Sequence, residues 1–119
     1  MAHLLITGAA SGLGAEIARD AVQRRHSVSL VDVQPAVEEL ARSIGGRALV
    51  VDLADGGAAA KIHAWAPDID ALINNAGLAT RALFADMPAE RAMRTVMVNA
   101  CAPMQLCGAY LPEIGRAHV

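Results

Sequence analysis

The sequence has few aromatic residues, few cysteines and little net charge. Phe, Trp and Tyr make up 3% of the 119 residues, so a hydrophobic core has to be built mostly from aliphatic side chains. The two cysteines, Cys101 and Cys107, are too few for a disulfide framework, and their spacing does not match a metal site. The four histidines show no ligand spacing either. We therefore expect no bound metal.

Clustered positive charge and long apolar runs are also missing. The net charge is −2 and the ten Lys and Arg residues are scattered, which argues against nucleic acid as a partner. No apolar stretch approaches the roughly 20 residues that a membrane-spanning helix requires. The N-terminus lacks the basic flank and the apolar run of a secretory signal. These absences lead us to expect a soluble, cytoplasmic protein that binds neither nucleic acid nor membrane.

Short apolar segments alternate with helical patterns along the whole chain. Because 55% of the residues are apolar, the chain is not disordered, and its length suits one domain with one core. The strand-like segments are continuous apolar runs, which is typical of a parallel sheet buried on both faces. The sequence thus predicts one α/β domain over 1–119, a doubly wound (Rossmann-like) parallel sheet with its first four to five strands. We expect strands at 3–7, 27–33, 47–52 and 69–74, the start of a fifth at 116–119, and helices at 35–46, 58–66 and 88–111.

A glycine-rich segment, LLITGAASGLG at 4–14, joins the first strand to a helical pattern in which apolar residues recur. Its glycines, Gly8, Gly12 and Gly14, follow the spacing T-G-x-x-x-G-x-G. Glycine permits positive φ and close approach of a ligand, and free N–H groups at a helix start attract a pyrophosphate. The alternative is a tight turn that binds nothing. The helical pattern after it has Leu13, Ile17, Ala18, Ala21 and Val22 on its apolar face.

Three later strand ends also carry polar or small residues. Asp32 ends the second strand, where a carboxylate can accept hydrogen bonds from ribose hydroxyls and would repel a 2′-phosphate. No Arg or Lys stands in the glycine segment or just after Asp32, so the sequence favours NAD over NADP. The segments VVDLAD and NNAG place Asp52 and 74–77 at the ends of the third and fourth strands. Each could be a turn alone, but together they indicate a ligand along one edge of the sheet.

These motifs, in this order, resemble the short-chain dehydrogenase/reductase family from Leu4 to Val119. NNAG is the most specific of them, because adenosylmethionine-binding methyltransferases, which resemble the chain in the first two strands, lack this motif. The resemblance implies hydride transfer between NAD(H) and a secondary alcohol or ketone. It also implies pyrophosphate and ribose contacts at the glycine segment, adenosine ribose at Asp32, adenine at Asp52, and nicotinamide ribose after the fourth strand. The implied cofactor-binding residues are Gly8, Ser11, Gly12, Leu13, Gly14, Asp32, Val33, Asp52, Leu53, Asn75, Ala76 and Gly77.

Asn99 matches the family's helix asparagine, which the resemblance implicates in a proton relay through a bound water. Pro103 lies four residues later and has no N–H, so the carbonyl of residue 99 loses its α-helical partner. A kink there would leave that oxygen free to hold water. The alternative is a proline kink without a functional role.

The family's catalytic serine and Tyr-x-x-x-Lys pair are not found in these residues. Tyr110, the one tyrosine, is followed four residues later by Ile114, so we expect it to be a packing residue. We therefore expect the chain to be the N-terminal part of a longer enzyme, inactive alone, with the missing residues beyond Val119. The alternative is a non-catalytic NAD-binding or interaction module.

The long helix predicted over 88–111 is rich in methionine and other apolar residues. Its apolar positions are Met93, Val96, Met97, Ala100, Met104 and Leu111, more than one contact with the sheet requires. The resemblance implies a homo-oligomer that packs through this helix. The alternative is a helix buried within the monomer, with methionine as core filling.

Overall fold

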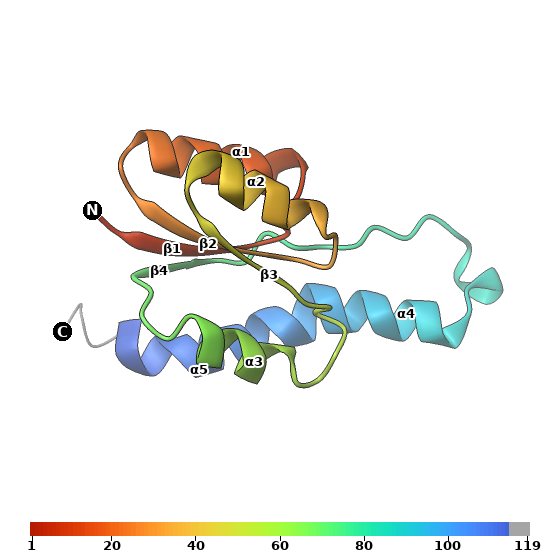
Figure 1. The fold of residues 1–119 in the computed structure, drawn as a ribbon. Helices are drawn as coiled ribbons and strands as arrows, with labels where there is room; N and C mark the ends of the chain where they lie inside the picture. The colour runs from red at the N-terminus through yellow and green to blue at the C-terminus, as the bar shows by residue number, and fades with distance from the viewer. Residues whose placement is uncertain (115–119) are drawn as a thin grey trace.

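A four-stranded parallel sheet lies between two layers of helices (Figure 1) in the computed structural model, which describes residues 1–114. The strands have the order β3-β2-β1-β4, so the chain returns past β1 to add β4 on its other side. This confirms the doubly wound α/β fold. The predicted strand at 116–119 lies outside the described residues. The strands are β1 (His3–Thr7), β2 (Ser27–Asp32), β3 (Arg47–Val50) and β4 (Ala71–Ile73).

Helices cover both faces of the sheet. Figure 1 shows α1 and α2 on one face and α3, α4 and α5 on the other, with the 3-10 turn η1 (Phe84–Asp86) in the long segment before α4. Among the helices of residues 1–114, none combines the length and the apolar character needed to cross a lipid bilayer. The helices are α1 (Gly12–Gln23), α2 (Ala36–Ile44), α3 (Ala58–Trp65), α4 (Ala89–Val96) and α5 (Ala102–Ile114).

The pleat of β1 shows why its sequence is a continuous apolar run. Successive side chains of a strand point to opposite faces. Leu5 packs into the cluster that contains Leu106 and Tyr110, whereas Ile6 packs into the cluster that contains Ala18 and the other buried alanines of α1. Since both faces are covered by helices, Leu5 and Ile6 are both buried, and both are apolar.

The buried face of α1 differs at one position from the apolar face that the sequence predicted. Its buried residues are Gly14, Ala15, Ala18 and Ala21, and their small size lets the helix approach the sheet closely. Leu13 is 69% exposed, although the apolar pattern included it. With 3.6 residues per turn, Leu13 is turned well away from the stripe centred on Ala18.

The long C-terminal helix is interrupted where the sequence predicted an irregularity. Between α4 and α5 lies a π-helical turn, η2 (Met97–Cys101), in which the N–H of Ala102 donates to the carbonyl of Met97 five residues earlier. Pro103 cannot supply an N–H to the carbonyl of residue 99, so a regular α-helix cannot pass this point unchanged. The helix also continues through Pro112 to Ile114, three residues beyond the predicted end at 111.

Tyr110 is buried beneath the sheet and is 1% exposed. Its hydroxyl donates to the carbonyl oxygen of Ala66 at 2.7 Å, which ties α5 to the end of α3. Burial, and to a smaller extent the negative charge of Glu113, raise the pKa of Tyr110 to about 12. The packing role expected from the sequence is the one that the structure shows.

Replacing Tyr110 with phenylalanine should lower the free energy of unfolding by about 1–2 kcal/mol at neutral pH, because a buried hydrogen bond is lost. The unfolded tyrosine ionises near pH 10 and the folded one near pH 12, so the parent chain should lose stability as pH rises through this interval. The Tyr110→Phe variant should show a flatter profile. Denaturant unfolding at several alkaline pH values measures both effects. Parallel profiles for the two proteins would contradict this account.

Candidate functional site

The segments after β1 and β4 are joined by hydrogen bonds at the carboxyl edge of the sheet. The hydroxyl oxygen of Thr7, itself 1% exposed, accepts the N–H groups of Asn75 at 3.1 Å and of Ala76 at 3.0 Å. The side-chain amide of Asn75 donates to the carbonyl of Gly8 at 3.1 Å. Part of the NNAG motif therefore braces the glycine segment.

Two of the three motif glycines are required by this close contact. A Cβ on Gly8 would lie 2.8 Å from the Cα of Ala76, and Gly8 has a positive φ of 66°. A Cβ on Gly14 would overlap the carbonyl oxygen of Gly8 and lie 2.6 Å from the amide nitrogen of Asn75. Gly12, by contrast, has open space around the position of a Cβ. Packing of the two segments thus accounts for Gly8 and Gly14 but not for Gly12.

The start of α1 offers N–H groups to an anion. Ser11 is the N-cap residue, and in the part of the chain that the structure describes its side chain makes no capping hydrogen bond. The first turn of α1 also contains no acidic residue. Since the first N–H groups of a helix have no intrahelical acceptor, this terminus can receive a phosphate.

Asp32 lies beside this helix start and is held by two backbone groups. One carboxylate oxygen accepts the N–H of Ala10 in the glycine segment at 2.9 Å, and the other accepts the N–H of Gln34 at 2.9 Å. Each carboxylate oxygen can accept a further hydrogen bond. The carboxylate is therefore fixed in place and still able to bind hydroxyl groups.

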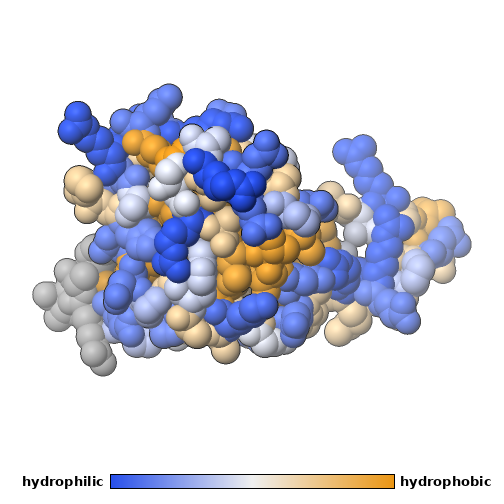
Figure 2. Space-filling model, viewed as in Figure 1, coloured by the Kyte–Doolittle hydropathy of each residue, from blue (hydrophilic) through white to orange (hydrophobic). Residues whose placement is uncertain are grey.

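A cavity of about 290 Å³ brings these elements together at the carboxyl edge. Its volume is at the lower end of the range for small-molecule sites, roughly 300–1,000 Å³. Figure 2 shows apolar surface in the middle of the visible face, near the segment that follows β3. The predicted residues that line the cavity are Gly8, Ser11, Asp32, Val33, Asp52, Leu53, Asn75, Ala76 and Gly77.

Four predicted residues are not part of this lining among the described residues: Gly12, Leu13, Gly14 and Asn99. Asn99 lies on η2 and binds the backbone of Leu78 with both ends of its amide. Its oxygen accepts the N–H of Leu78 at 2.7 Å and its nitrogen donates to the carbonyl of Leu78 at 2.8 Å. Asn99 thus fixes the segment after β4 against the π-helical turn.

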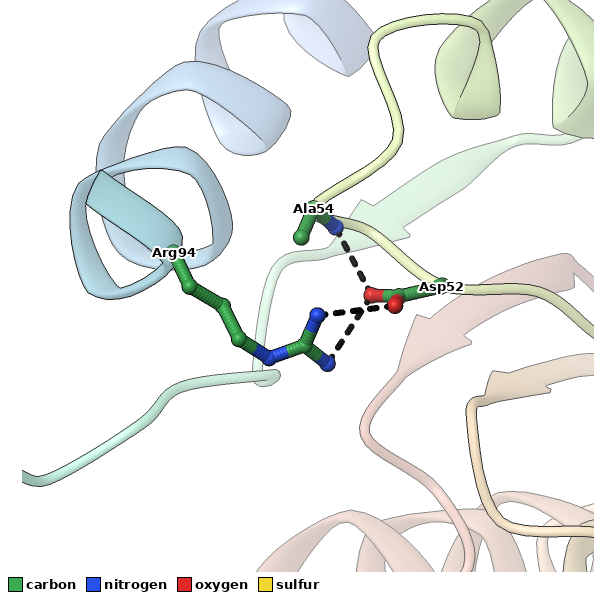
Figure 3. A network of polar contacts seen from close by, with 3 residues as sticks. All are labelled: Asp52, Ala54 and Arg94. Atoms are coloured by element: carbon green, nitrogen blue, oxygen red, sulfur yellow. Dashed lines mark hydrogen bonds and ion pairs between the residues drawn. The ribbon is translucent and has the colours of Figure 1, made fainter. Parts of the chain in front are cut away.

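Arg94 is a cavity residue that the sequence did not reveal. Its guanidinium on α4 donates to both carboxylate oxygens of Asp52, at 2.8 and 3.1 Å, and the N–H of Ala54 donates to one of the same oxygens at 2.9 Å (Figure 3). The hydrogen bonds from Arg94 and then from Ala54 hold the pKa of the Asp52 carboxyl below its usual value. No spacing rule connects residues 42 positions apart, so in the sequence Arg94 resembles any solvated helix arginine.

Within residues 1–114, no three His, Cys, Asp or Glu side chains gather in an arrangement that could hold a metal ion. The candidate site is built instead from backbone N–H groups, two carboxylates, one guanidinium and apolar walls.

Comparison with known proteins agrees with this geometry. Residues 2–118 match the short chain dehydrogenase family. Oxidoreductase UcpA of Escherichia coli K12 is 33% identical over 92% of this chain, and the match covers 45% of its own length. The chain therefore spans about half the length of the curated relatives that it matches.

Solved structures give the same result. The bulky-bulky ketone specific alcohol dehydrogenase from Comamonas testosteroni superposes with a TM-score of 0.92 at 28% identity, covering 98% of this chain and 51% of that one. A short-chain dehydrogenase from Sphingobium yanoikuyae in complex with NADPH has a TM-score of 0.84 at 30% identity, covering 98% and 50%.

Substituting alanine for Gly14 should destabilise the chain by about 1–3 kcal/mol, because the new methyl group overlaps the backbone of Gly8. Gly108 provides a matched control: it also lies in a helix, and a Cβ there would meet open space. Gly108→Ala should raise stability by up to about 1 kcal/mol through helix propensity. Denaturant unfolding of both variants checks the contrast in sign. Equal stability of Gly14→Ala and the parent would refute the packing argument.

Proposed function

This chain belongs to the short-chain dehydrogenase family, and we propose that it is the dinucleotide-binding part of an oxidoreductase that transfers hydride between NAD(H) and a secondary alcohol or ketone. The observation that carries the proposal is the meeting, in one cavity, of the fixed Asp32 carboxylate and the glycine segment beside the start of α1. This combination suits a nucleotide, which joins an anionic phosphate to a ribose with two hydroxyl groups. In this proposal residues 1–119 form one dinucleotide-binding unit of a longer single-domain enzyme.

The residues at the carboxyl edge offer groups that suit the parts of the cofactor. The pyrophosphate would be held by Gly12, which has open space at its Cβ position, and by the free N–H groups after Ser11. Leu13 and Gly14 would complete the turn. Asp32 and Val33 would bind the adenosine ribose, and Asp52 and Leu53 would lie along the adenine. Asn75, Ala76 and Gly77 would contact the nicotinamide ribose. When bound, nicotinamide supplies the carbon that accepts or donates hydride.

Asn99 would serve the proton relay through its backbone and not its side chain, because its amide is already bound to Leu78 at both ends. The groups that exchange the hydroxyl proton would be supplied by residues after Val119. We therefore expect the 119-residue chain alone to bind cofactor and to show no turnover. We also propose a cytoplasmic location, the expectation drawn from the sequence.

NAD is the cofactor that the charges support. Asp32 would face a 2′-phosphate and repel it. Arg94 is the only Lys or Arg side chain among the described cavity residues, and it is engaged with Asp52. The NADPH complex of the Sphingobium yanoikuyae protein shows that a relative binds the phosphorylated form.

Isothermal titration of the chain with NAD and with NADP tests the proposal. The parent should bind NAD more tightly than NADP. Asp32→Asn should reduce the ratio of the two affinities about tenfold, because the repulsion between Asp32 and the 2′-phosphate is removed. Asp20→Asn removes the same charge from the exposed side of α1 and should leave the ratio unchanged. If NADP binds the parent as tightly as NAD, the role given to Asp32 is incorrect. Binding with no turnover in any longer form of the protein would favour a non-catalytic NAD-binding or interaction module.

We also propose that the chain forms a homo-oligomer through its long helix. Large apolar side chains on α4 and α5 remain exposed in the monomer, with Met93 60%, Val96 49%, Met104 67% and Leu111 57% accessible. Exposed apolar positions recurring along one helix are typical of an association surface.

Met104→Glu should shift the chain toward monomer, because it places a charge within the apolar surface. Gln105→Glu adds the same charge at the next, polar and exposed position of α5 and should leave association intact. Sedimentation velocity over a range of concentrations distinguishes them. A parent chain that stays monomeric throughout would rule out association through this helix in residues 1–119.

A further inference from the structure

The turn between α1 and β2 holds His26 in a fixed position. α1 ends in a Schellman motif, in which the N–H of Arg25 donates to the carbonyl of Val22 at 3.0 Å. In the same motif the N–H of His26 donates to the carbonyl of Ala21 at 2.9 Å. Arg25 has a positive φ of 69°, at the position of the motif that usually contains glycine. The turn lies on the same side of the sheet as the N-terminus (Figure 1).

Ala2 is tied to this turn by two hydrogen bonds. Its N–H donates to Nδ1 of His26 at 2.9 Å, and its carbonyl oxygen accepts the N–H of Ser27 at 2.9 Å. A backbone N–H can only donate, so Nδ1 must carry a lone pair and the ring proton must lie on Nε2. When the ring takes up a second proton, both of its nitrogens become donors. The N–H of Ala2 then faces another N–H, and the hydrogen bond to His26 is lost.

His3, on the adjoining strand β1, is bound in a way that protonation does not break. Its Nδ1 lies 2.8 Å from the carbonyl oxygen of Asp68 and therefore carries a hydrogen. Its Nε2 lies 2.7 Å from the hydroxyl oxygen of Ser29, which can donate to it or accept from it. The neutral and the charged forms of His3 can thus keep both contacts. The two histidines at this edge of the sheet should have opposite tautomers, with the proton on Nε2 in His26 and on Nδ1 in His3.

The charges around His26 give a proton on its ring no direct partner. Within residues 1–114, His26 forms no ion pair with a carboxylate. Asp20 is already paired with Arg24 at 2.9 Å, and Asp70 accepts the backbone N–H of His3 at 2.8 Å. The charged and titratable groups on the elements around His26 are Asp20 on α1, Arg24 and Arg25 in the turn, the Met1 amino group, His3 on β1, Arg47 on β3, and Asp68 and Asp70 before β4.

We infer that His26 is an acid-sensitive tether, which holds the N-terminal residues against the turn between α1 and β2 when neutral and releases them when protonated. In the unfolded chain His26 has no such hydrogen bond to lose, so the unfolded chain takes up the proton more readily than the folded one. The stabilisation from this bond is therefore present above about pH 6.5, where an unfolded histidine is mostly neutral, and is lost as the pH falls below that value. Because His3 keeps the start of β1 in the sheet, the release is confined to Met1 and Ala2.

Nuclear magnetic resonance of the whole chain tests this inference. The ring ¹⁵N shifts at about pH 7.5 should show the opposite tautomers of His26 and His3. Between about pH 7.5 and about pH 5.5, the protection of the Ala2 and Ser27 N–H groups from hydrogen exchange should fall about fivefold or more, as expected for the loss of one hydrogen bond. The N–H of Asp70, which donates to the carbonyl of His3 at 2.8 Å, should keep its protection. Equal protection of Ala2 at both pH values, or a proton on Nδ1 of neutral His26, would overturn the inference.

His26→Asn separates the tether from other titrating groups, because the side-chain oxygen of asparagine can accept the N–H of Ala2 in place of Nδ1 and does not titrate. It should keep the protection of Ala2 constant between the two pH values, whereas His26→Phe, which has no acceptor, should give low protection at both. His63→Asn is the matched control: it removes a histidine of α3 that makes no hydrogen bond to Ala2 among the described residues, so its pH response should equal that of the parent. Circular dichroism should show that the variants are folded. A fall in protection in His26→Asn as large as in the parent would assign the response to another group and refute the role of His26.

Discussion

The close contact between the segment after β1 and the segment after β4 is the constraint on which the rest of the site depends. A single buried hydroxyl, that of Thr7, accepts two backbone N–H groups from the second segment, and Asn75 returns a hydrogen bond to the first. The backbones can approach this closely only because Gly8 and Gly14 have no side chain. The position of the α1 start, and with it one wall of the cavity, follows from that approach.

The two carboxylates at this edge are stabilised in different ways. Asp32 is held by backbone N–H groups close to it in space and has no cationic partner within residues 1–114. Asp52 is neutralised by Arg94 from another element of the fold. The field at the ribose position is therefore negative, whereas the field at the far end is close to balanced. A ligand that carries hydroxyl groups at one point and a neutral, polar ring at the other suits this distribution.

Local patterns allowed the strands, the sheet type and most of the cavity lining to be predicted. Apolar runs locate strands, glycines and Pro35 mark turns, and strand ends in a parallel sheet meet at one edge. Arg94 was not predictable, since its partner is distant in sequence and an arginine on an exposed helix is ordinarily solvated. Leu13 was misplaced because an apolar residue in the first turn of a helix fits a periodic pattern whether or not the sheet lies beneath it. The form of the irregularity near Asn99 also depends on tertiary contacts, because a missing N–H is compatible with a kink or with a π-helical turn.

The central place of β1 in the sheet has a consequence for how the chain folds as it is synthesised. β1 can pair with β2 soon after the first half emerges, but its other edge pairs with β4, and Leu4 meets Ala71 only when most of the chain is available. The α1 and α2 layer can form early. The opposite face, with Leu5 and Val31, is covered by α3 and α5, which come later. Until then a nascent chain presents an open apolar sheet face, a surface that molecular chaperones bind and on which premature association would begin.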